Sequence, residues 1–338
     1  MSRRKVRLSD VASEAGVSPA TVSRAISQPA LLSTETLGRV RAAAERLGYR
    51  PDAAARALAS GRSMTIGAVM PTLENAIFSK ALQAMHGTLA AEGYQLLVAS
   101  HDYNPAAEVE AIRTLLSRGV DGLILVGAER APEATALLDG SAIPVVCTWC
   151  APTGAAGVVV DNALAGAMAT RHLVALGHRR IGVITGSVRF NDRQRARLAG
   201  IRAALHDAGL ALPAAFAREE ATSVAGGRMG CAALLGLAEP PTAIVGGIDL
   251  VAIGCIVEAQ ARGLSVPGDL SVASIDDVDM SAHVAPSLTT VRVPTTRIGA
   301  EAATKVVAML RGDTGAGVDC LPVELIVRRS SGAPRETS

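Results

Sequence analysis

Aromatic residues are scarce in this chain: phenylalanine, tyrosine and tryptophan together make up only 2% of its 338 residues. Because 49% of the residues are nevertheless hydrophobic, the cores have to be built from alanine, valine, leucine and isoleucine. Lysine is almost missing as well, with only Lys5, Lys80 and Lys305, so arginine carries most of the positive charge. The length is sufficient for two or three domains with cores of their own.

Long hydrophobic runs are also missing. No apolar stretch reaches the roughly 18 to 20 residues that a membrane-spanning helix needs. The charged N-terminus, residues 1–5, is not followed by the apolar segment of a secretion signal. We therefore expect a cytoplasmic protein with no membrane partner, in which the five cysteines are reduced. Cys147 and Cys150 have the C-x-x-C spacing of redox and metal sites, but no second pair completes a metal site, and a strand running into a loop is the favoured alternative.

Signatures of the common enzyme classes are absent. The sequence contains no G-x-G-x-x-G after its first strands, no G-x-S-x-G, no H-E-x-x-H and no P-loop. Its six histidines are scattered, and none pairs with an evident nucleophile. The sequence therefore indicates neither an enzyme nor a cofactor.

What the sequence does contain is a pattern of two short helices joined by a tight turn, over residues 8–24. One small apolar face recurs at helical spacing in the first helix, formed by Val11, Ala12 and Ala15. Gly16 supplies the positive φ that the turn requires, Ser18 can cap the second helix, and Pro19 suits its first turn. This pattern is typical of a helix-turn-helix, whose second helix enters the major groove of DNA. An amphipathic helix pair of another kind of protein is the alternative.

The charge distribution favours the DNA-binding interpretation. Residues 1–62 carry eleven basic and five acidic side chains, a net charge of +6, whereas the remainder carries a net charge of −4. A basic segment at one end of a slightly acidic chain suits the binding of phosphates by that end. A solvated basic tail is the alternative, but the segment also holds apolar periodicity and helix caps.

The organisation of the chain changes twice. A third helix is expected between its cap, Ser33, and Gly48, after which Pro51 interrupts the helical pattern. We expect an all-α helix-turn-helix headpiece over residues 1–49, a hinge helix with a linker over residues 50–63, an α/β body over residues 64–329 and a flexible tail over residues 330–338. A hinge helix this short is marginal unless it has a partner.

Within the expected body, short apolar strands alternate with helices. The predicted strands are 66–70, 95–99, 122–126, 145–148, 158–160, 181–185, 243–246 and 271–275. The predicted helices are 78–92, 106–117, 163–176, 195–208, 226–237 and 250–262. This alternation implies parallel sheets covered on both faces, and its length favours two lobes. Since ligands bind beyond the carboxyl ends of such strands, a ligand is expected between the lobes.

These features together resemble the LacI/GalR family of bacterial transcriptional regulators. The resemblance rests on the helix-turn-helix at residues 10–24, the hinge at 47–59, the turn into a strand at 176–181 and the segment at 288–291 that crosses between lobes. It implies a helix-turn-helix headpiece joined to a body of two parallel-sheet lobes, like that of periplasmic binding proteins.

The resemblance also implies a function. It indicates a repressor that binds double-stranded operator DNA and whose operator affinity is controlled by a small sugar or sugar acid. No leucine heptads follow Arg329, so the tetramerising tail of some relatives is absent and a homodimer is expected. A two-lobed sugar-binding protein without a regulatory role, or an activator of the same family, is the alternative.

The residues expected to contact DNA follow from the same resemblance. In the second helix they are Ser18, Pro19, Ala20, Thr21 and Arg24. Arg24 is the best candidate for a direct contact, because a guanidinium group matches a guanine edge or a phosphate. In the hinge, Leu58, followed by Ala59, matches the leucine that relatives insert into the minor groove to kink the duplex. The alternative for Leu58 is one apolar residue on an alanine-rich helix.

For the effector, the resemblance points to two charged residues near the ends of strands. Arg197 matches a ligand-binding arginine, and Asp276 matches an acidic group that binds hydroxyls; a salt bridge between lobes is the alternative for both. Phe78 and Trp149 either stack on a sugar ring or fill the core. Asn191 and Arg193, in the loop before Arg197, are weaker candidates.

One position departs from the family pattern. Relatives carry an Asn-Asp pair where this chain has Ile248-Asp249, so one polar contact to the ligand is missing. Asp249 either compensates for it or only caps the following helix. The segment 101–105 and the helix start that carries Phe78 resemble gluconate-type regulators of the family.

Overall fold

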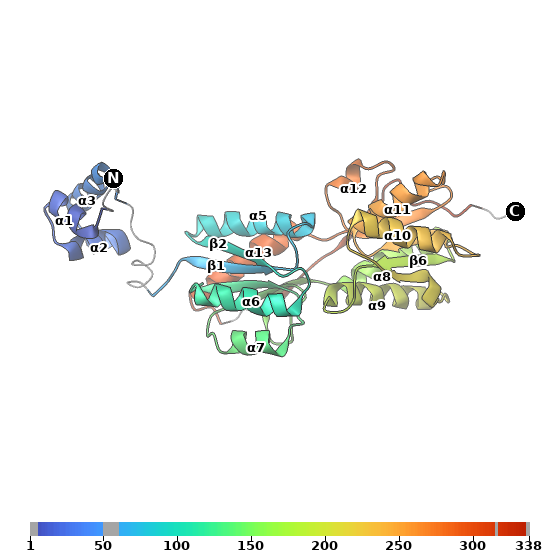
Figure 1. Ribbon diagram of the computed structural model, residues 1–338, viewed down its shortest axis with the longest axis horizontal. Helices are drawn as coiled ribbons and strands as arrows, with labels where there is room; N and C mark the ends of the chain where they lie inside the picture. Colours follow the sequence, from blue (N-terminus) through green and yellow to red (C-terminus); the bar gives the residue numbers. More distant parts are fainter. Residues whose placement is uncertain (1–5, 50–60, 315–316, 336–338) are drawn as a thin grey trace. The chain divides into compact units, whose positions relative to one another are not determined.

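The computed structural model describes residues 6–49, 61–314 and 317–335 (Figure 1). The chain divides into two compact units. The first holds the described residues up to Thr65 together with Gly119–Asp121, and the second holds Ile66–Arg118 and the residues from Gly122 onward. Leu58 and Ala59 of the predicted hinge lie outside the described residues.

The first unit contains the predicted helix-turn-helix. Helix α1 (Leu8–Ala15) ends at Gly16, whose φ of 64° lies in the left-handed region, and α2 (Pro19–Ser27) follows at once. Ser18 caps α2 by accepting a hydrogen bond from the Thr21 amide at 3.1 Å. A short 3₁₀ turn, η1 (Pro29–Leu31), leads into α3 (Thr34–Leu47). The buried core consists of Val11, Ala12, Ala15, Val22, Ala25, Val40 and Ala43.

An arginine ties the third helix to the turn. The Arg39 guanidinium donates to the carbonyl oxygens of Ala15, at 2.7 Å, and Gly16, at 3.0 Å. These oxygens end α1, where the negative end of the helix dipole favours a cation. The contact holds α3 against the turn and thereby fixes the angle at which α2 leaves α1.

The second unit is built from two six-stranded sheets, one in each lobe. The first-lobe sheet has the order β11-β5-β4-β3-β1-β2. Its strands are β1 (Thr65–Met70), β2 (Gln95–Ser100), β3 (Gly122–Val126), β4 (Val145–Trp149), β5 (Ala156–Val160) and β11 (Val318–Leu321). Its helices are α5 (Ala76–Ala91), α6 (Pro105–Ser117), α7 (Pro132–Asp139) and α13 (Thr295–Leu310). The pairs β1–β3, β3–β4, β4–β5 and β5–β11 are parallel.

The second-lobe sheet has the order β12-β10-β9-β8-β6-β7. Its strands are β6 (Ile181–Thr185), β7 (Ala217–Glu219), β8 (Ala243–Gly246), β9 (Ser271–Asp276), β10 (Thr289–Arg292) and β12 (Glu324–Ile326). Only the pair of β10 with β12 is antiparallel. The helices are α8 (Asn162–Ala175), α9 (Asp192–Asp207), α10 (Val224–Leu235), α11 (Asp249–Ala261) and the short α12 (Met280–His283), with the 3₁₀ turn η2 (Ala214–Phe216) before β7.

The chain crosses between the lobes three times: after β5, after β10 and after β11. Helix α13, late in the sequence and drawn in orange, therefore lies beside α5, drawn in cyan, in the first lobe (Figure 1). The body with two parallel-dominated sheets confirms the predicted fold class.

Helices α8 and α9 approach unusually closely, and two glycines make this possible. A Cβ on Gly166 would overlap the backbone carbonyl of Arg197, and a Cβ on Gly200 would overlap that of Ala163. Since no other residue lacks a Cβ, the pairing depends on glycine at both positions. The contact fixes the backbone of Arg197 directly against α8.

All eight predicted strands are confirmed, but several further elements, most of them toward the C-terminus, were not predicted. Strands β7, β10, β11 and β12 and helices α7, α12 and α13 are additional, and α9 begins at Asp192, three residues earlier than expected. A flexible tail was expected from residue 330, but Ser330 is fully buried. Its hydroxyl donates to the Val272 carbonyl at 2.6 Å, and His178 Nε2 contacts the Gly332 carbonyl at 2.9 Å.

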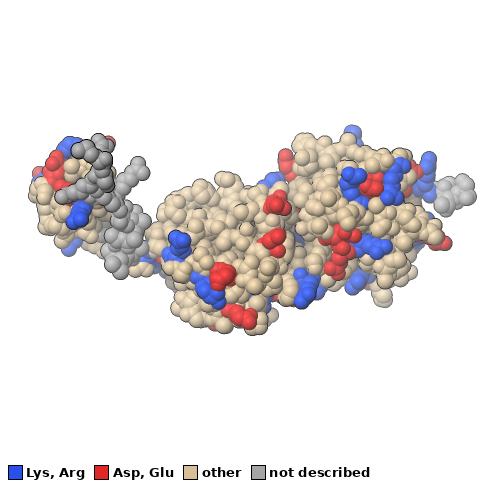
Figure 2. Space-filling view, in the orientation of Figure 1, with Lys and Arg blue, Asp and Glu red and all other residues tan. Residues whose placement is uncertain are grey.

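The surface of the second unit mixes charges of both signs. On the face shown in Figure 2, acidic and basic side chains lie side by side over the second lobe, whereas much of the first lobe carries neither. Among the described residues, no helix is long and apolar enough to cross a membrane.

Candidate functional site

The residues predicted to contact DNA lie together at the start of α2. Ser18, Pro19, Ala20 and Arg24 are exposed, and Thr21 is half-buried. Ser18 and Thr21 are hydrogen-bonded to each other through their hydroxyls at 2.9 Å, so both are held in place by the helix cap. The side chain of Arg24, in the second turn of the helix, has no hydrogen bond or ion pair with any described residue and is available for an external partner.

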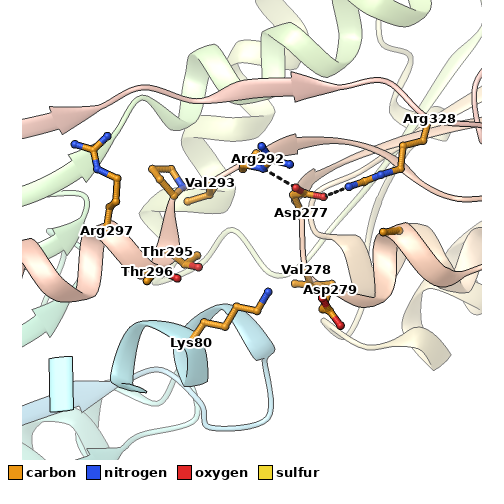
Figure 3. A pocket seen from close by; sticks show the side chains of 12 residues that line it. Lys80, Asp277, Val278, Asp279, Arg292, Val293, Thr295, Thr296, Arg297 and Arg328 are labelled. Carbon is orange, nitrogen blue, oxygen red and sulfur yellow. Dashed lines mark hydrogen bonds and ion pairs between the residues drawn. The ribbon is translucent and has the colours of Figure 1, made fainter. Parts of the chain in front are cut away.

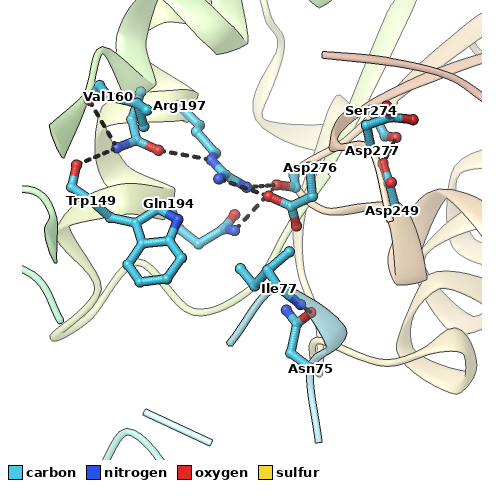
Figure 4. A network of polar contacts seen from close by, with 12 residues as sticks. Asn75, Ile77, Trp149, Val160, Gln194, Arg197, Asp249, Ser274, Asp276 and Asp277 are labelled. Atoms are coloured by element: carbon cyan, nitrogen blue, oxygen red, sulfur yellow. Dashed lines mark hydrogen bonds and ion pairs between the residues drawn. The ribbon is translucent and has the colours of Figure 1, made fainter. Parts of the chain in front are cut away.

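The second unit holds a buried network centred on Arg197, whose residue is 2% exposed. Its guanidinium donates to Asn162 Oδ1 at 3.1 Å, to the Gly247 carbonyl at 2.7 Å and to Asp276 Oδ1 at 2.9 Å (Figure 4). Arg197 comes from α9 and Asp276 from the end of β9. The structure thus brings together the two residues that the sequence singled out for the effector, and both belong to the second lobe.

Asp276 is held in an unusual state. Burial raises its pKa to about 7, although the adjacent Arg197 guanidinium acts to lower it. The backbone at Asp276 has a φ of 135°, and at Asp277 a φ of 57°, conformations that residues other than glycine rarely adopt. Strain of this kind persists where the surrounding structure enforces it and is concentrated at ligand sites.

Trp149, at the end of β4, and Phe78, on α5, pack edge to face with ring centroids 5.2 Å apart. Both are fully buried, so each fills the core of the first lobe at least in part. Trp149 also has a positive φ of 63°, and its indole Nε1 has no hydrogen-bond partner in the part of the chain that the structure describes. Buried polar atoms are rarely left unsatisfied, which marks Nε1 as a candidate ligand contact.

Two polar side chains near this network were not anticipated from the sequence. Asn162 donates to the Trp149 carbonyl at 3.2 Å and accepts from Arg197, so it connects the first-lobe tryptophan to the second-lobe arginine. Gln194 donates to the Gly247 carbonyl at 3.3 Å, while its buried Oε1 lacks a partner. Figure 4 shows Gln194 between Trp149 and Asp276. Two features of the sequence could have identified them: Asn162 follows the end of a strand, and Gln194 lies at helical spacing from Arg197.

Asp249 differs from both of its predicted roles. It is fully buried, and its carboxylate accepts from the hydroxyls of Ser274, Ser281 and Thr290 and from the Val278 amide. It does not cap α11, because the N-cap position belongs to Ile248, whose side chain is buried in the core of the second lobe. Asp249 therefore braces β9, α12 and β10 internally and has no free side facing a ligand.

The weaker candidates also have internal partners. Asn191 is buried and caps α9 by accepting from the Gln194 amide at 3.3 Å. Arg193 is paired with Asp192 at 2.8 Å. Asp192 in turn accepts from the Ala128 amide of the first lobe at 2.5 Å, so the start of α9 links the two lobes.

A narrow pocket lies at the carboxyl ends of β1, β2 and β3, where they face the start of α9. Its lining includes His101, Tyr103, Glu108, Arg130 and Arg193, and its volume is about 20 Å³, room for about one water molecule. Burial, together with the positive charges of Arg193 and Arg130, lowers the pKa of His101 to about 4. His101 Nδ1 and Arg130 Nε are buried and have no hydrogen-bond partner among the described residues.

The C-x-x-C pair is a strand that runs into a loop. Cys147 is buried in β4, and Cys150 follows it. Burial raises the pKa of both thiols, that of Cys150 to about 12, which disfavours the reactive thiolate. Within the described ranges, no group of three or more His, Cys, Asp or Glu residues is placed to hold a metal ion.

Comparisons with known proteins match both units. Residues 7–52 match the model for bacterial regulatory proteins of the lacI family, and residues 170–331 match that for a periplasmic binding protein-like domain. The transcriptional regulator GntR of Escherichia coli K12 is 31% identical over 93% of this chain and 95% of its own length. The structure of the lac repressor dimer bound to operator and the anti-inducer ONPF has a TM-score of 0.88 at 28% identity, covering 98% of this chain and 100% of that one.

A complex of the transcriptional regulator CelR with cellobiose is also similar, with a TM-score of 0.72 and 27% identity over 96% of this chain and 100% of that one. The fold and these matches define a DNA-binding transcriptional regulator. The chain belongs to the LacI family of bacterial regulatory proteins.

Proposed function

We propose that this LacI-family protein is a repressor that binds operator DNA as a homodimer and whose operator affinity is set by a sugar or sugar acid bound between its lobes. The observation that carries the effector part is the buried Arg197–Asp276 pair beside two polar atoms without partners, Trp149 Nε1 and Gln194 Oε1. The relative solved with cellobiose and the one solved as a dimer on operator DNA support the ligand class and the assembly.

On the DNA side, the exposed start of α2 supports a recognition role. Ala20 and Arg24 face outward for contacts to bases or phosphates, whereas Ser18 and Thr21 fix the helix end and can approach a phosphate. Leu58 and Ala59 remain proposed minor-groove residues on the basis of the sequence resemblance alone. The finer likeness to gluconate-type regulators also remains a prediction.

On the effector side, we assign Arg197 and Asp276 to the hydroxyl or acid groups of the ligand and the face of Trp149, supported by Phe78, to its ring. Arg193 borders the same region through the narrow pocket. Asn191 and Asp249 act as supports for α9 and β9. Since Arg197, Asp276 and Trp149 are buried, a sugar can reach them only if side chains move or the lobes separate.

The relatives are transcriptional regulators rather than enzymes, and we infer that this chain also acts by binding without catalysis. A protein that works on operator DNA meets its target in the bacterial cytoplasm, where we place it.

The test is a gel-shift series on the DNA upstream of the gene that encodes the protein, with and without a panel of sugars and sugar acids. Binding should weaken steeply with salt, because each neutralised phosphate releases nearly one counterion. One member of the panel should change the operator affinity of the wild type and leave that of Arg197→Met unchanged. Failure to bind any DNA in the series would contradict the DNA-binding half of the proposal, and an identical response of both proteins would contradict the effector half.

A further inference from the structure

A second and larger cavity, of about 370 Å³, lies elsewhere in the body (Figure 3). It is bordered by α5, by the segment from β9 to α12, by the junction of β10 with α13 and by Arg328. None of the residues of the Arg197 network lines it. Its volume falls in the range of about 300 to 1,000 Å³ that is typical of small-molecule sites.

The N-terminus of α13 opens into this cavity. The helix is 16 residues long, and Pro294 at its N-cap provides no side-chain cap. The backbone N–H groups of Thr296 and Arg297 have no acceptor in the described ranges. Uncapped amides at the start of a long helix, together with its dipole, favour an anion.

Two side chains add donors at the same place. Thr295 is only 7% exposed and lines the cavity, yet its hydroxyl has no hydrogen-bond partner among the described residues. Lys80 extends from α5 into the space between Thr295 and the Val278–Asp279 segment, as Figure 3 shows, and forms no ion pair with any described residue. A threonine hydroxyl without a partner and an ammonium group without a carboxylate therefore line the same cavity as the uncapped helix end.

The remaining charges around the cavity are largely paired with one another. Arg292 and Arg328 bind the two oxygens of Asp277, at 2.7 and 2.6 Å. Arg297 pairs with Glu301 at 2.9 Å, and Arg292 also reaches Glu324 at 3.3 Å. Asp279, which also lines the cavity, is exposed and forms no ion pair with Lys80.

We infer that this cavity is a second ligand site, which binds the phosphate group of a small metabolite. The phosphate oxygens accept from the Thr296 and Arg297 amides and from the Thr295 hydroxyl, and the Lys80 ammonium balances their charge. The rest of the metabolite occupies the space toward Arg328 and Val278. The protein thus has a second small-molecule input besides the effector between its lobes.

The experiment is a titration of the full-length protein with inorganic phosphate at constant ionic strength, followed by calorimetry and by phosphorus NMR. Binding should be saturable, and Lys80→Met should weaken it about tenfold or more, since a hydrogen bond to a charged group contributes roughly 1.5 to 3 kcal/mol. Thr295→Val, which removes the hydroxyl at nearly constant shape, should weaken binding several-fold without changing the unfolding midpoint.

Two control variants locate the phosphate. Arg113→Met removes one exposed positive charge on α6, where Arg113 pairs with Glu110, and should leave the affinity unchanged. Arg197→Met should also leave it unchanged, because Arg197 belongs to the other site. The inference is overturned if phosphate binding is not saturable, if Lys80→Met binds phosphate as the wild type does, or if Arg197→Met abolishes the binding.

Discussion

Two buried polar networks in the second lobe, one around Asp249 and one around Arg197 and Asp276, differ in how completely their groups are paired. The Asp249 carboxylate is surrounded by three hydroxyls and one amide, all of which donate to it. The Arg197 network has good internal contacts but leaves the neighbouring Trp149 Nε1 and Gln194 Oε1 without partners. Complete pairing suits a brace, whereas incomplete pairing in a buried region indicates a place for a ligand.

The largest expected effect is on effector affinity, which should depend on the Arg197 network. Arg197→Met should lower effector affinity about 100-fold or more, because a buried charged hydrogen-bond donor is removed while the packing of its stem is retained. Trp149 is the only tryptophan, so its fluorescence during an effector titration reports on this region. Arg171→Met, which removes an exposed arginine paired with Asp207 on the same pair of helices, should bind effector normally. If Arg197→Met and the wild type bound effector with equal affinity, Arg197 would not belong to the effector site.

The second largest expected effect is on the free energy of unfolding, which should depend on the Asp249 network more than on Asp276. Asp249→Asn should lower the free energy of unfolding by about 2 kcal/mol, because an amide nitrogen replaces an acceptor that the Val278 amide and Ser281 hydroxyl require. Asp276→Asn should not lower it at pH 7, since burial favours a neutral side chain at this position whereas the carboxyl group of the unfolded wild type is ionised. Urea unfolding of both variants provides the measurement. A larger loss for the Asp276 variant would reverse the assigned roles.

Asp276 should also give stability a characteristic pH dependence. Its pKa is about 7 in the folded protein against an ordinary 3.8, so between these values the folded state holds a proton that the unfolded state releases. Its contribution is therefore complete below pH 3.8 and is lost as the pH rises through about 7, by at most about 1.4 kcal/mol per pH unit.

The Asp276→Asn variant isolates this contribution. His101, with its pKa lowered to about 4, acts in the opposite direction, because its contribution is lost as the pH falls from 6.5 to 4, but it is present in both proteins. The unfolding free energy of the wild type minus that of the variant should fall between pH 5 and 8. A difference that stays constant over this range would show that Asp276 titrates normally.

The smallest expected effect concerns Asn191, which was predicted to contact the effector and instead caps α9. Asn191→Ala should cost about 1 kcal/mol of stability, and Asn191→Ser, which preserves a capping oxygen, should recover most of it. Thermal unfolding measures the first effect, and the Trp149 titration should show unchanged effector affinity for the serine variant. A serine variant that folds well and binds effector poorly would return Asn191 to the ligand site.

The contrast between the networks also explains what could be predicted from the sequence. Arg197 and Asp276 were singled out because the resemblance to the LacI/GalR family places a ligand-binding arginine and an acidic group at these positions. The role of Asp249 was predicted wrongly, because its partners Ser274, Ser281 and Thr290 are 25 to 41 residues away and nothing local shows that they surround it. Gln194 and Asn162 were missed for the same reason.

The fold shows the same contrast between elements that neighbouring residues determine and elements that depend on contacts far away in the sequence. The eight predicted strands have continuous apolar runs flanked by turn residues. Strands β11 and β12 are four and three residues long and partly exposed, so only their pairing with β5 and β10 makes them strands. Helix α13 lies beyond the crossing segment at 288–291, and its place in the first lobe depends on contacts with α5, more than 200 residues earlier.

The three crossings between lobes have a consequence for how the protein is made. A ribosome releases the headpiece first, and the local contacts of α1 to α3 allow it to fold at once. The first lobe cannot be completed before the second lobe is translated, because α13 and β11 follow most of the second lobe in the sequence. Until residues 295–321 emerge, α5 and the edge of β5 stay uncovered in the nascent chain. Chaperone binding during translation is thus expected at the first lobe, which is completed only when residues 295–321 have been translated.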